Sequence, residues 1–412
     1  MFLRKWEPEM IDWKITPFSE CIVRHEVKRQ NQINNSEIQA VGRFPVIDQG
    51  QSFIAGYTND EERVIYNGLP YIIFGDHTRC FKFVDFPFVL GADGTKVLKP
   101  DEARFDSKFF YFALINQKIP SRGYNRHFKL LKESSVPHPA DTWEQKKIAS
   151  LLTLVQRAIE QQERLIALTT ELKKALMHKL FTDGRRGEKQ KQTEIGPVPE
   201  SWKVIPLGSL LKMAQYGLSV KGSAAGSYPM LRMTNQINGQ IVPNDLKWVE
   251  ISEADFNKFS VKRGDVLFNR TNSYDLVGRT AIFDLDGEYA FASYLIRLRV
   301  DHDMLDSFFL NHYLNCDETQ QRLKSIATRA VSQSNISATR LKSFMIPLPS
   351  LEEQDEVIST LNIVDKKIAE HKQFAYALQC LFQTLLHQLM TAQIRVKDLD
   401  LTELGYEPIA TG

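Results

Sequence analysis

The sequence predicts an α+β protein with two similar mixed α/β globular domains and two long helices that pair as an antiparallel coiled coil. Three observations support this fold class. One stretch occurs twice, at 141–182 and 350–391, an offset of 209 positions (350 minus 141). Each copy carries an apolar seam at helical spacing. The strand-rich segments before the two copies also repeat, so we expect a pseudo-two-fold molecule.

The repeated stretches are expected to form the long helices. Each begins with a capping-box pattern, Asp141 with Glu144 and Ser350 with Glu353. Apolar residues then recur at steps of three and four, which keeps them on one side of a helix. A helix this long is not stable alone, and its own copy is the nearest partner. The predicted seam comprises Ile148, Leu152, Val155, Ile159, Leu172, Leu176, Leu180, Val357, Leu361, Val364, Ile368, Leu378, Leu381 and Leu385.

Length and composition set limits on the class of protein. The chain has 412 residues, 43% hydrophobic and 25% charged, which is typical of a globular protein with two or more domains. The net charge is only +2, so a nucleic-acid surface would have to be local. Four scattered cysteines without a C-x-x-C pair indicate a reducing compartment and argue against a zinc site. We find no signal-peptide pattern and no membrane-spanning run, and expect a cytoplasmic protein with no membrane partner.

The segment before the first long helix mixes short strands with turns. Strands are predicted at Phe44–Ile47, Tyr71–Phe74 and Phe81–Leu90, because these runs are rich in aromatic and β-branched residues. Residues 106–114 have the pattern of an amphipathic helix capped by Asp106. Asp183-Gly184 marks a glycine cap at the end of the first long helix, and the polar residues after it are typical of a linker.

The second half repeats this order. Trp202–Pro206 resembles Trp13–Pro17, and Asp306–Phe309 resembles Asp106–Phe109. We therefore divide the chain into a first globular domain at 1–140, a first long helix at 141–184, a linker at 185–200, a second globular domain at 201–349, a second long helix at 350–391 and a C-terminal tail at 392–412.

Basic and amide-bearing loops occur at equivalent places in the two halves. Arginine and lysine neutralise phosphates, and arginine, asparagine and glutamine hydrogen-bond base edges in the major groove of DNA. A solvated surface loop is the simpler interpretation of any one of them, and their repetition favours binding. The candidate DNA-binding residues are Arg79, Arg122, Tyr124, Asn125, Arg126, His127, Lys129, Arg232, Asn235, Arg270, Asn272, Arg279, Arg329, Gln333 and Asn335.

Motifs for catalysis are missing. The run Gly91-Ala92-Asp93-Gly94-Thr95-Lys96 has the wrong spacing for a phosphate-binding loop. The sequence has no H-E-x-x-H, no metal-ligand cluster and no amino-methyltransferase tetrapeptide, in which Pro-Pro follows an acid or asparagine. We therefore predict no catalytic residues and no metal site in this chain. A coiled-coil adaptor that binds only protein partners remains an alternative to a DNA-binding protein.

Several motifs resemble those of the specificity subunit of a type I restriction-modification enzyme. They are Ile195–Trp202, Gly264–Phe268, Asn335–Ser337 with Leu341-Lys342, and Ile346–Gln354. The resemblance spans essentially the whole chain. The first domain departs from it, with Asn125-Arg126-His127 in place of Asn-Ile-Ser and Asp141-Thr142-Trp143 in place of the Leu-Glu lead.

This resemblance implies a non-catalytic reader of double-stranded DNA. Two target recognition domains would each read one half of a bipartite site, spaced by the antiparallel helices. The helices would dock two modification subunits, which methylate adenine at N6 with S-adenosylmethionine, and the complex would include restriction (motor) subunits that use ATP and Mg²⁺. No cofactor would be bound by this chain itself.

Overall fold

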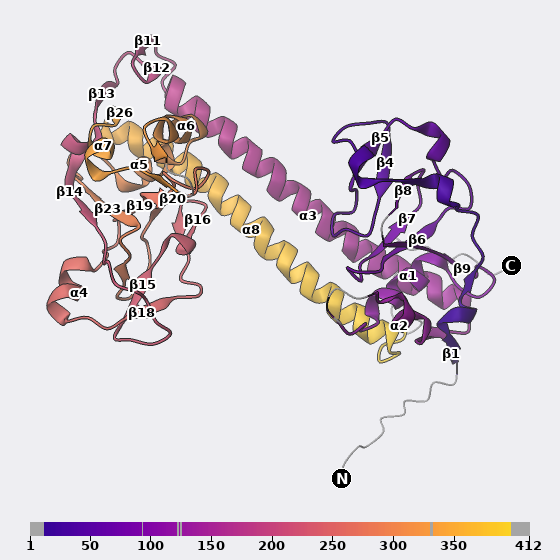
Figure 1. The fold of residues 1–412 in the computed structure, drawn as a ribbon. Helices are drawn as coiled ribbons and strands as arrows, with labels where there is room; N and C mark the ends of the chain where they lie inside the picture. The colour runs from indigo at the N-terminus through magenta and orange to yellow at the C-terminus, as the bar shows by residue number, and fades with distance from the viewer. Residues whose placement is uncertain (1–11, 93, 122, 124–125, 330–332, 397–412) are drawn as a thin grey trace. The chain divides into compact units, whose positions relative to one another are not determined.

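The computed structural model describes residues 12–92, 94–121, 123, 126–329 and 333–396 (Figure 1). The chain divides into two compact units, one formed by residues 1–163 with 373–412 and the other by residues 164–372. Each unit therefore contains a globular domain together with a part of each long helix. These helices are α3, Thr142–Asp183, and α8, Leu351–Met390.

The first unit contains two four-stranded sheets, ordered β2-β9-β6-β7 and β3-β8-β4-β5, and the pair β1-β10. The helix α1 packs on the first sheet, and its aromatic residues supply much of the core. The strands are β1 (Trp13–Pro17), β2 (Ile22–Val23), β3 (Gln32–Ile33), β4 (Phe44–Ile47), β5 (Gly56–Thr58), β6 (Tyr71–Gly75), β7 (Phe81–Val84), β8 (Val89–Gly91), β9 (Thr95–Pro100) and β10 (Ser135–Pro139), and the helices are α1 (Ser107–Asn116) and α2 (Phe128–Lys132).

The second unit is built on a six-stranded sheet, ordered β14-β23-β19-β21-β17-β16, with smaller sheets β18-β15-β22, β20-β25-β24 and β13-β26. Its elements are β11 (Gln190–Thr193), β12 (Gly196–Pro199), β13 (Lys203–Pro206), β14 (Leu211–Tyr216), β15 (Tyr228–Leu231), β16 (Gln236–Ile237), β17 (Gln240–Ile241), β18 (Lys247–Val249), α4 (Glu253–Phe259), β19 (Val266–Asn269), β20 (Thr271–Asn272), β21 (Thr280–Ile282), β22 (Ala290–Phe291), β23 (Leu295–Val300), α5 (Ser307–Leu314), α6 (Asp317–Ser325), β24 (Thr328–Arg329), β25 (Ser334–Asn335), α7 (Ala338–Lys342) and β26 (Met345–Leu348).

The same device joins each globular domain to the start of a long helix. Gln145 of α3 is fully buried; its amide donates to the carbonyls of Arg104 and Pro139 and its oxygen accepts from the N–H of Asp106. Gln354 of α8, 209 positions later, repeats these bonds with Met304, Pro349 and Asp306. Asp106 and Asp306 in turn cap α1 and α5, as predicted for the first of them. The sequence repeat is therefore a repeat of buried hydrogen bonds.

Within each unit the two long helices pack side by side and antiparallel. In the second unit the end of α3 meets the start of α8: Lys173 pairs with Asp365, and Arg186 pairs with Glu352. In the first unit the start of α3 shares a core with the end of α8, through Ile148, Ala149, Leu152, Leu386, Leu389 and Met390. The predicted antiparallel pairing is confirmed in both units.

The seam is correct over most of its length and wrong at one repeated position. Leu172 and Leu381 are 58% and 46% exposed. The neighbouring residues, Lys173 and Phe382, face the partner elements instead. Lys173 does so because Asp365 neutralises its ammonium group, at 2.6 Å, and Phe382 because it packs on Phe112. The other predicted seam residues are buried or half-buried.

The starts of the long helices differ from the predicted capping boxes in one respect. Asp141 and Ser350 accept backbone N–H groups as expected, from Trp143 and Glu353. The glutamates have other partners: both oxygens of Glu144 accept from Arg395 at 2.8 Å, and Glu353 accepts from the indole N–H of Trp202 at 2.9 Å. Both glutamates are buried, so hydrogen bonds from these donors replace the predicted bond to the backbone N–H of the cap residue.

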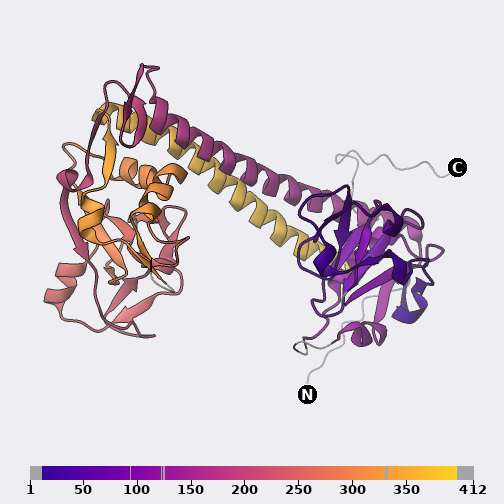
Figure 2. The same ribbon diagram turned by 45° about the horizontal axis from the view of Figure 1, so that its top comes forward.

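The first long helix ends at Asp183, and Gly184 follows with φ +64°, the left-handed conformation expected of a glycine cap. The predicted linker then forms a short hairpin, β11-β12, at the end of α3 (Figure 2). Gly196, with φ +106°, helps to close its turn.

One predicted strand is two strands. Residues 81–90 divide into β7, which pairs with β6, and β8, which pairs with β3 and β4. Pro87 lies between them and lacks the N–H that a continuous ladder requires. In the part of the chain that the structure describes, no helix has the length and apolar character needed to cross a membrane.

Candidate nucleic-acid interface

In the first domain, the structure brings together two loops that the sequence analysis selected separately. The loop after β6 presents Asp76, which is buried. Its carbonyl accepts from the backbone N–H of His127 at 3.0 Å, and its carboxylate accepts from the N–H of Phe128 at 2.8 Å. The segment that precedes α2 is thereby fixed to the turn between β6 and β7.

The candidate residues of these loops differ in burial. His127 is fully buried, with Nδ1 at 2.9 Å from the carbonyl oxygen of Asp76, so we assign it a structural role. Arg79, Arg126 and Lys129 are exposed, and Lys129 has a long, solvated contact of 3.9 Å with Glu133. The remaining first-domain candidates, Arg122, Tyr124 and Asn125, lie outside the described residues.

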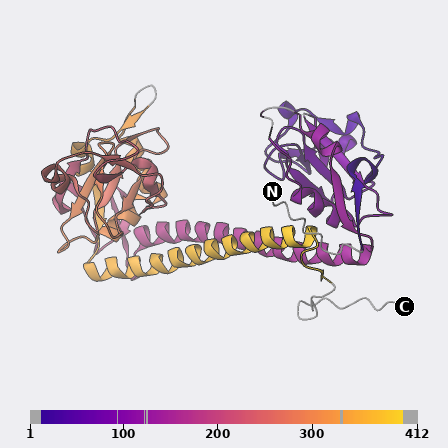
Figure 3. The same cartoon turned by 90° about the horizontal axis from the view of Figure 1, so that it is seen from below.

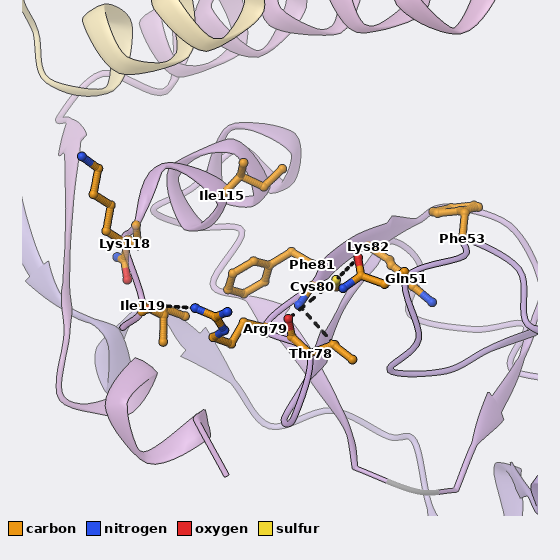
Figure 4. A pocket seen from close by; sticks show the side chains of 11 residues that line it. Gln51, Phe53, Thr78, Arg79, Cys80, Phe81, Lys82, Ile115, Lys118 and Ile119 are labelled. Carbon is orange, nitrogen blue, oxygen red and sulfur yellow. Dashed lines mark hydrogen bonds between the residues drawn. The ribbon is translucent and has the colours of Figure 1, made fainter. Parts of the chain in front are cut away.

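A hollow of about 700 Å³ lies beside Arg79 (Figure 4). Arg79 has φ +63°, uncommon for a residue other than glycine, and its guanidinium donates to the carbonyl of Ile119 at 3.0 Å. Phe53 and Phe81 supply apolar surface to the hollow, and Lys118 adds a second exposed cation beside Arg79. Lys118 was not selected from the sequence, and only the fold places it on the same hollow as Arg79.

In the second domain the equivalent two loops are also joined, here by paired strands instead of individual hydrogen bonds. The strand β20, which follows β19, pairs with β25: Thr271 lies opposite Asn335 and Asn272 opposite Ser334. The N–H of Ile336 also donates to the carbonyl of Arg270 at 2.9 Å. The strand β24 extends this small sheet, which stands out from the body of the unit (Figure 3).

Arginine–tyrosine stacks flank the small sheet. The guanidinium carbon of Arg270 lies 4.6 Å from the ring centre of Tyr216, and that of Arg329 lies 3.9 Å from the ring centre of Tyr274. Both tyrosines are more than one third exposed. Both arginines were candidate residues and neither tyrosine was. Each tyrosine is distant in sequence from the arginine above it, and only the fold places its ring beneath that cation.

Two further candidates of the second domain are engaged inside it. Asn235 is fully buried and donates to the carbonyls of Val242 and Asn244. Arg232 forms a salt bridge of 3.1 Å with Asp245. We assign these two residues a structural role, because the Asn235 amide and one terminal nitrogen of Arg232 are bonded within the domain.

The remaining candidates lie on or beside the small sheet. Asn335 donates to the hydroxyl of Thr271 at 2.6 Å, and Asn272 contacts the sulfur of Met233 at 3.1 Å. Arg279 and Gln333 are exposed. Within the described residues no group of three or more His, Cys, Asp or Glu side chains is placed to hold a metal ion. The loops of the first domain and the small sheet of the second domain thus present cations, amides and exposed rings. Such groups are suited to binding phosphates and base edges.

Comparison with known proteins shows which family this chain resembles. Residues 199–376 match the family described as "Type I restriction modification DNA specificity domain". The chain is therefore similar to type I specificity subunits. The putative type I restriction enzyme MjaX specificity subunit of Methanocaldococcus jannaschii is 31% identical over 54% of this chain and 53% of its own length. The EcoKI specificity subunit of Escherichia coli is 26% identical over 74% of this chain and 65% of its own length.

These two matches cover less than two thirds of each of those specificity subunits. A longer match is to the MjaVIII specificity subunit of Methanocaldococcus jannaschii, 27% identical over 94% of both chains. The crystal structure of the type I restriction-modification S subunit from M. genitalium has a TM-score of 0.60 at 18% identity, covering 94% of this chain and 98% of that chain. The predicted fold of a specificity subunit is thus confirmed.

The long helices of this chain also expose a repeated apolar surface. On α3, within the second unit, Leu165, Leu168 and Leu172 are 40%, 57% and 58% exposed, at steps of three and four that place them on one helix face. On α8, within the first unit, Phe374 and Leu381 are 55% and 46% exposed. Phe374 and Leu381 are the equivalents of Leu165 and Leu172 at the offset of 209, so each unit carries one copy of this surface.

Proposed function

We propose that this chain is the sequence-specific DNA-recognition subunit of a type I restriction-modification complex. Each globular domain reads one half of a bipartite site in double-stranded DNA. The chain performs no catalysis and binds no cofactor of its own. The similarity to type I specificity subunits supports this assignment, and the DNA face is argued from the residues of this chain.

One observation carries the proposal. In both domains the fold unites the loop after an equivalent central strand, β6 or β19, with the loop before an equivalent short helix, α2 or α7. The joined loops carry different side chains in the two domains. They are Arg79, Arg126 and Lys118 in the first domain, and Arg270, Arg279 and Arg329 in the second. A repeated scaffold with different polar residues is what two independent readers of two unlike half-sites require.

The partners follow from the helices and the family. Two equivalent exposed apolar surfaces on α3 and α8 are suited to two copies of one partner, since exposed apolar patches mark interaction sites. We infer that these partners are modification subunits, which bring S-adenosylmethionine and methylate adenine, and that restriction subunits using ATP and Mg²⁺ join the assembly. Base flipping would belong to the modification subunits.

A coiled-coil adaptor that binds only proteins is disfavoured. It accounts for the helices and their apolar surfaces, and leaves the duplicated basic loops without a role. The two functions differ in what the assembled complex retains: a reader retains one bipartite sequence over a scrambled duplex, whereas an adaptor retains neither.

The experiment compares the purified chain with the chain assembled on its modification subunits. We expect the isolated chain to transfer no methyl group from S-adenosylmethionine to duplex DNA, and the assembled complex to methylate adenines within one bipartite sequence. Methyl transfer by the pure polypeptide would overturn the non-catalytic assignment. Methylation without any bipartite preference would overturn the reading function.

A further inference from the structure

The second domain contains arginines that differ in how far they are already engaged. Arg263 pairs with Asp284, and Arg299 pairs with Asp265 through two bonds of 2.8 Å. Arg340 donates to the carbonyl of Ile326 and to the hydroxyl of Thr328, at the base of β24. Arg329 is exposed, and among the described residues no carboxylate lies within salt-bridge distance of it. Its hydrogen-bond donors therefore remain available to a ligand.

Arg329 is also held in place. Its guanidinium carbon lies over the ring of Tyr274, 3.9 Å from the ring centre, so the aromatic face supports the cation. Lys324, at 5.9 Å from the same ring centre, adds positive charge. The backbone beneath the stack is fixed, because Arg329 lies opposite Ser334 in the β24-β25 pair and Asn335 is bonded to Thr271.

The chemistry of a supported, unpaired guanidinium points to a definite ligand. Its parallel N–H donors match two acceptors on one edge, and in the major groove guanine alone presents such a pair, N7 and O6. A two-stranded ribbon such as β24-β25 is narrow enough to enter that groove. Phosphate oxygens also accept from arginine, often through two parallel bonds, but a phosphate contact carries no sequence information, so sequence preference distinguishes the two ligands.

We propose that Arg329, held over the ring of Tyr274, reads a guanine in the half-site bound by the second domain. Tyr274 is then a positioning residue, which acts through Arg329. This inference rests on the proposed function and adds to it one base and the pair of side chains that recognises it.

The test uses the assembled complex and maps methylated adenines across a genome for each variant. The unsubstituted complex first defines the two half-sites. Arg329→Ala should lose discrimination at a single G·C position of one half-site, by about tenfold or more, and leave the other half-site unchanged. Arg329→Lys keeps the charge and loses the fork, so it should show the same relaxed position.

Tyr274 variants test the positioning. Tyr274→Phe keeps the ring and should keep the sequence preference, whereas Tyr274→Leu should relax the position that Arg329→Ala relaxes. Arg263→Ala is the matched control: this exposed arginine precedes β19, at the end of the strand opposite the small sheet, and should leave the methylated sequence unchanged. Thermal unfolding of each variant checks that the domain is intact, as expected for exposed side chains.

The outcomes separate the inference from the function beneath it. An identical sequence preference in Arg329→Ala, or a uniform loss of affinity that Arg329→Lys restores, would overturn the guanine contact and indicate a phosphate contact in the second case. Either result leaves the reading function standing. Methylation by the unsubstituted complex without a bipartite sequence would overturn the proposed function itself.

Discussion

At the scale of residues, a charged cluster in the second unit replaces aromatic rings of the first. Lys173 lies 2.6 and 2.8 Å from the two oxygens of Asp365, beside the buried His312. The equivalents of Lys173 and His312 are Phe382 and Phe112, which pack with ring centres 6.0 Å apart. Burial, and then the charge of Lys173, lowers the pKa of His312 from its ordinary value to about 4. The cluster makes the two halves chemically distinct where each domain meets the long helices.

This lowered pKa predicts a pH dependence of stability. In the unfolded chain His312 titrates near 6.5, so between pH 6.5 and about 4 the unfolded state binds a proton that the folded state rejects. Stability is therefore present above pH 6.5 and falls as the pH decreases, by up to ~1.4 kcal/mol per pH unit. His312→Gln removes this titration.

Thermal unfolding at pH 7 and pH 5 should show a larger fall in Tm for the unsubstituted chain than for His312→Gln. Equal falls in the two proteins would mean that His312 does not titrate as its burial indicates. The comparison cancels the other acid-sensitive groups, which both proteins share.

At the scale of elements, one face of the long helices is buried in the core and another is exposed. Leu152 is fully buried in the core of the first unit, whereas Leu172, twenty residues later on α3, is 58% exposed in the second. Leu152→Asp should destabilise the protein by about 3 kcal/mol or more, because it buries an unpaired carboxylate. Leu172→Asp should change stability by less than about 0.5 kcal/mol. Chemical denaturation measures both, and a large loss in the second variant would place Leu172 back in the seam.

The same element gives a binding test. Leu172→Asp combined with Leu381→Asp should weaken association with the modification subunit by about tenfold or more, since it charges both copies of the apolar surface. Lys174→Asp, on the same helix, is a control for charge alone. Undiminished association of the double variant in a titration would remove this surface as the docking site.

The elements also show how far sequence reasoning reaches. Periodicity and caps located both long helices, because a repeated seam and a glycine cap are local signals. The choice of Leu172 over Lys173 failed because Asp365, which neutralises the lysine, lies 192 residues away in sequence. Likewise, His127 and Asn235 have the residue types of a DNA contact, and only the fold shows that their hydrogen bonds are made internally. Tyr274 lies in the same polar loop as Arg270, but only the fold places its ring beneath Arg329 and that of Tyr216 beneath Arg270.

At the scale of the whole molecule, both long helices pass without interruption through the two units. The unit boundary falls at Glu163–Arg164 in α3 and at Lys372–Gln373 in α8. If the helices set the gap between half-sites, a heptad inserted at both points keeps the seam in register and adds about 10 Å. At ~3.4 Å per base pair this equals about three base pairs. Methylation mapping should then show the same half-sites with a longer gap; an unchanged gap at full activity would rule out this role.

The central claim is that each globular domain reads its own half-site. The second domain is bounded by neighbouring strands, since β13 pairs with β26 from Lys203 opposite Leu348 to Pro206 opposite Met345, so the segment between them can be exchanged as a unit. The most direct measurement is genome-wide mapping of adenine methylation in cells that carry a complex with residues 203–348 replaced by the corresponding segment of another specificity subunit. The account predicts that one half of the methylated sequence changes to that of the donor and the other half stays as it was. A change in both halves, or in neither, would contradict it.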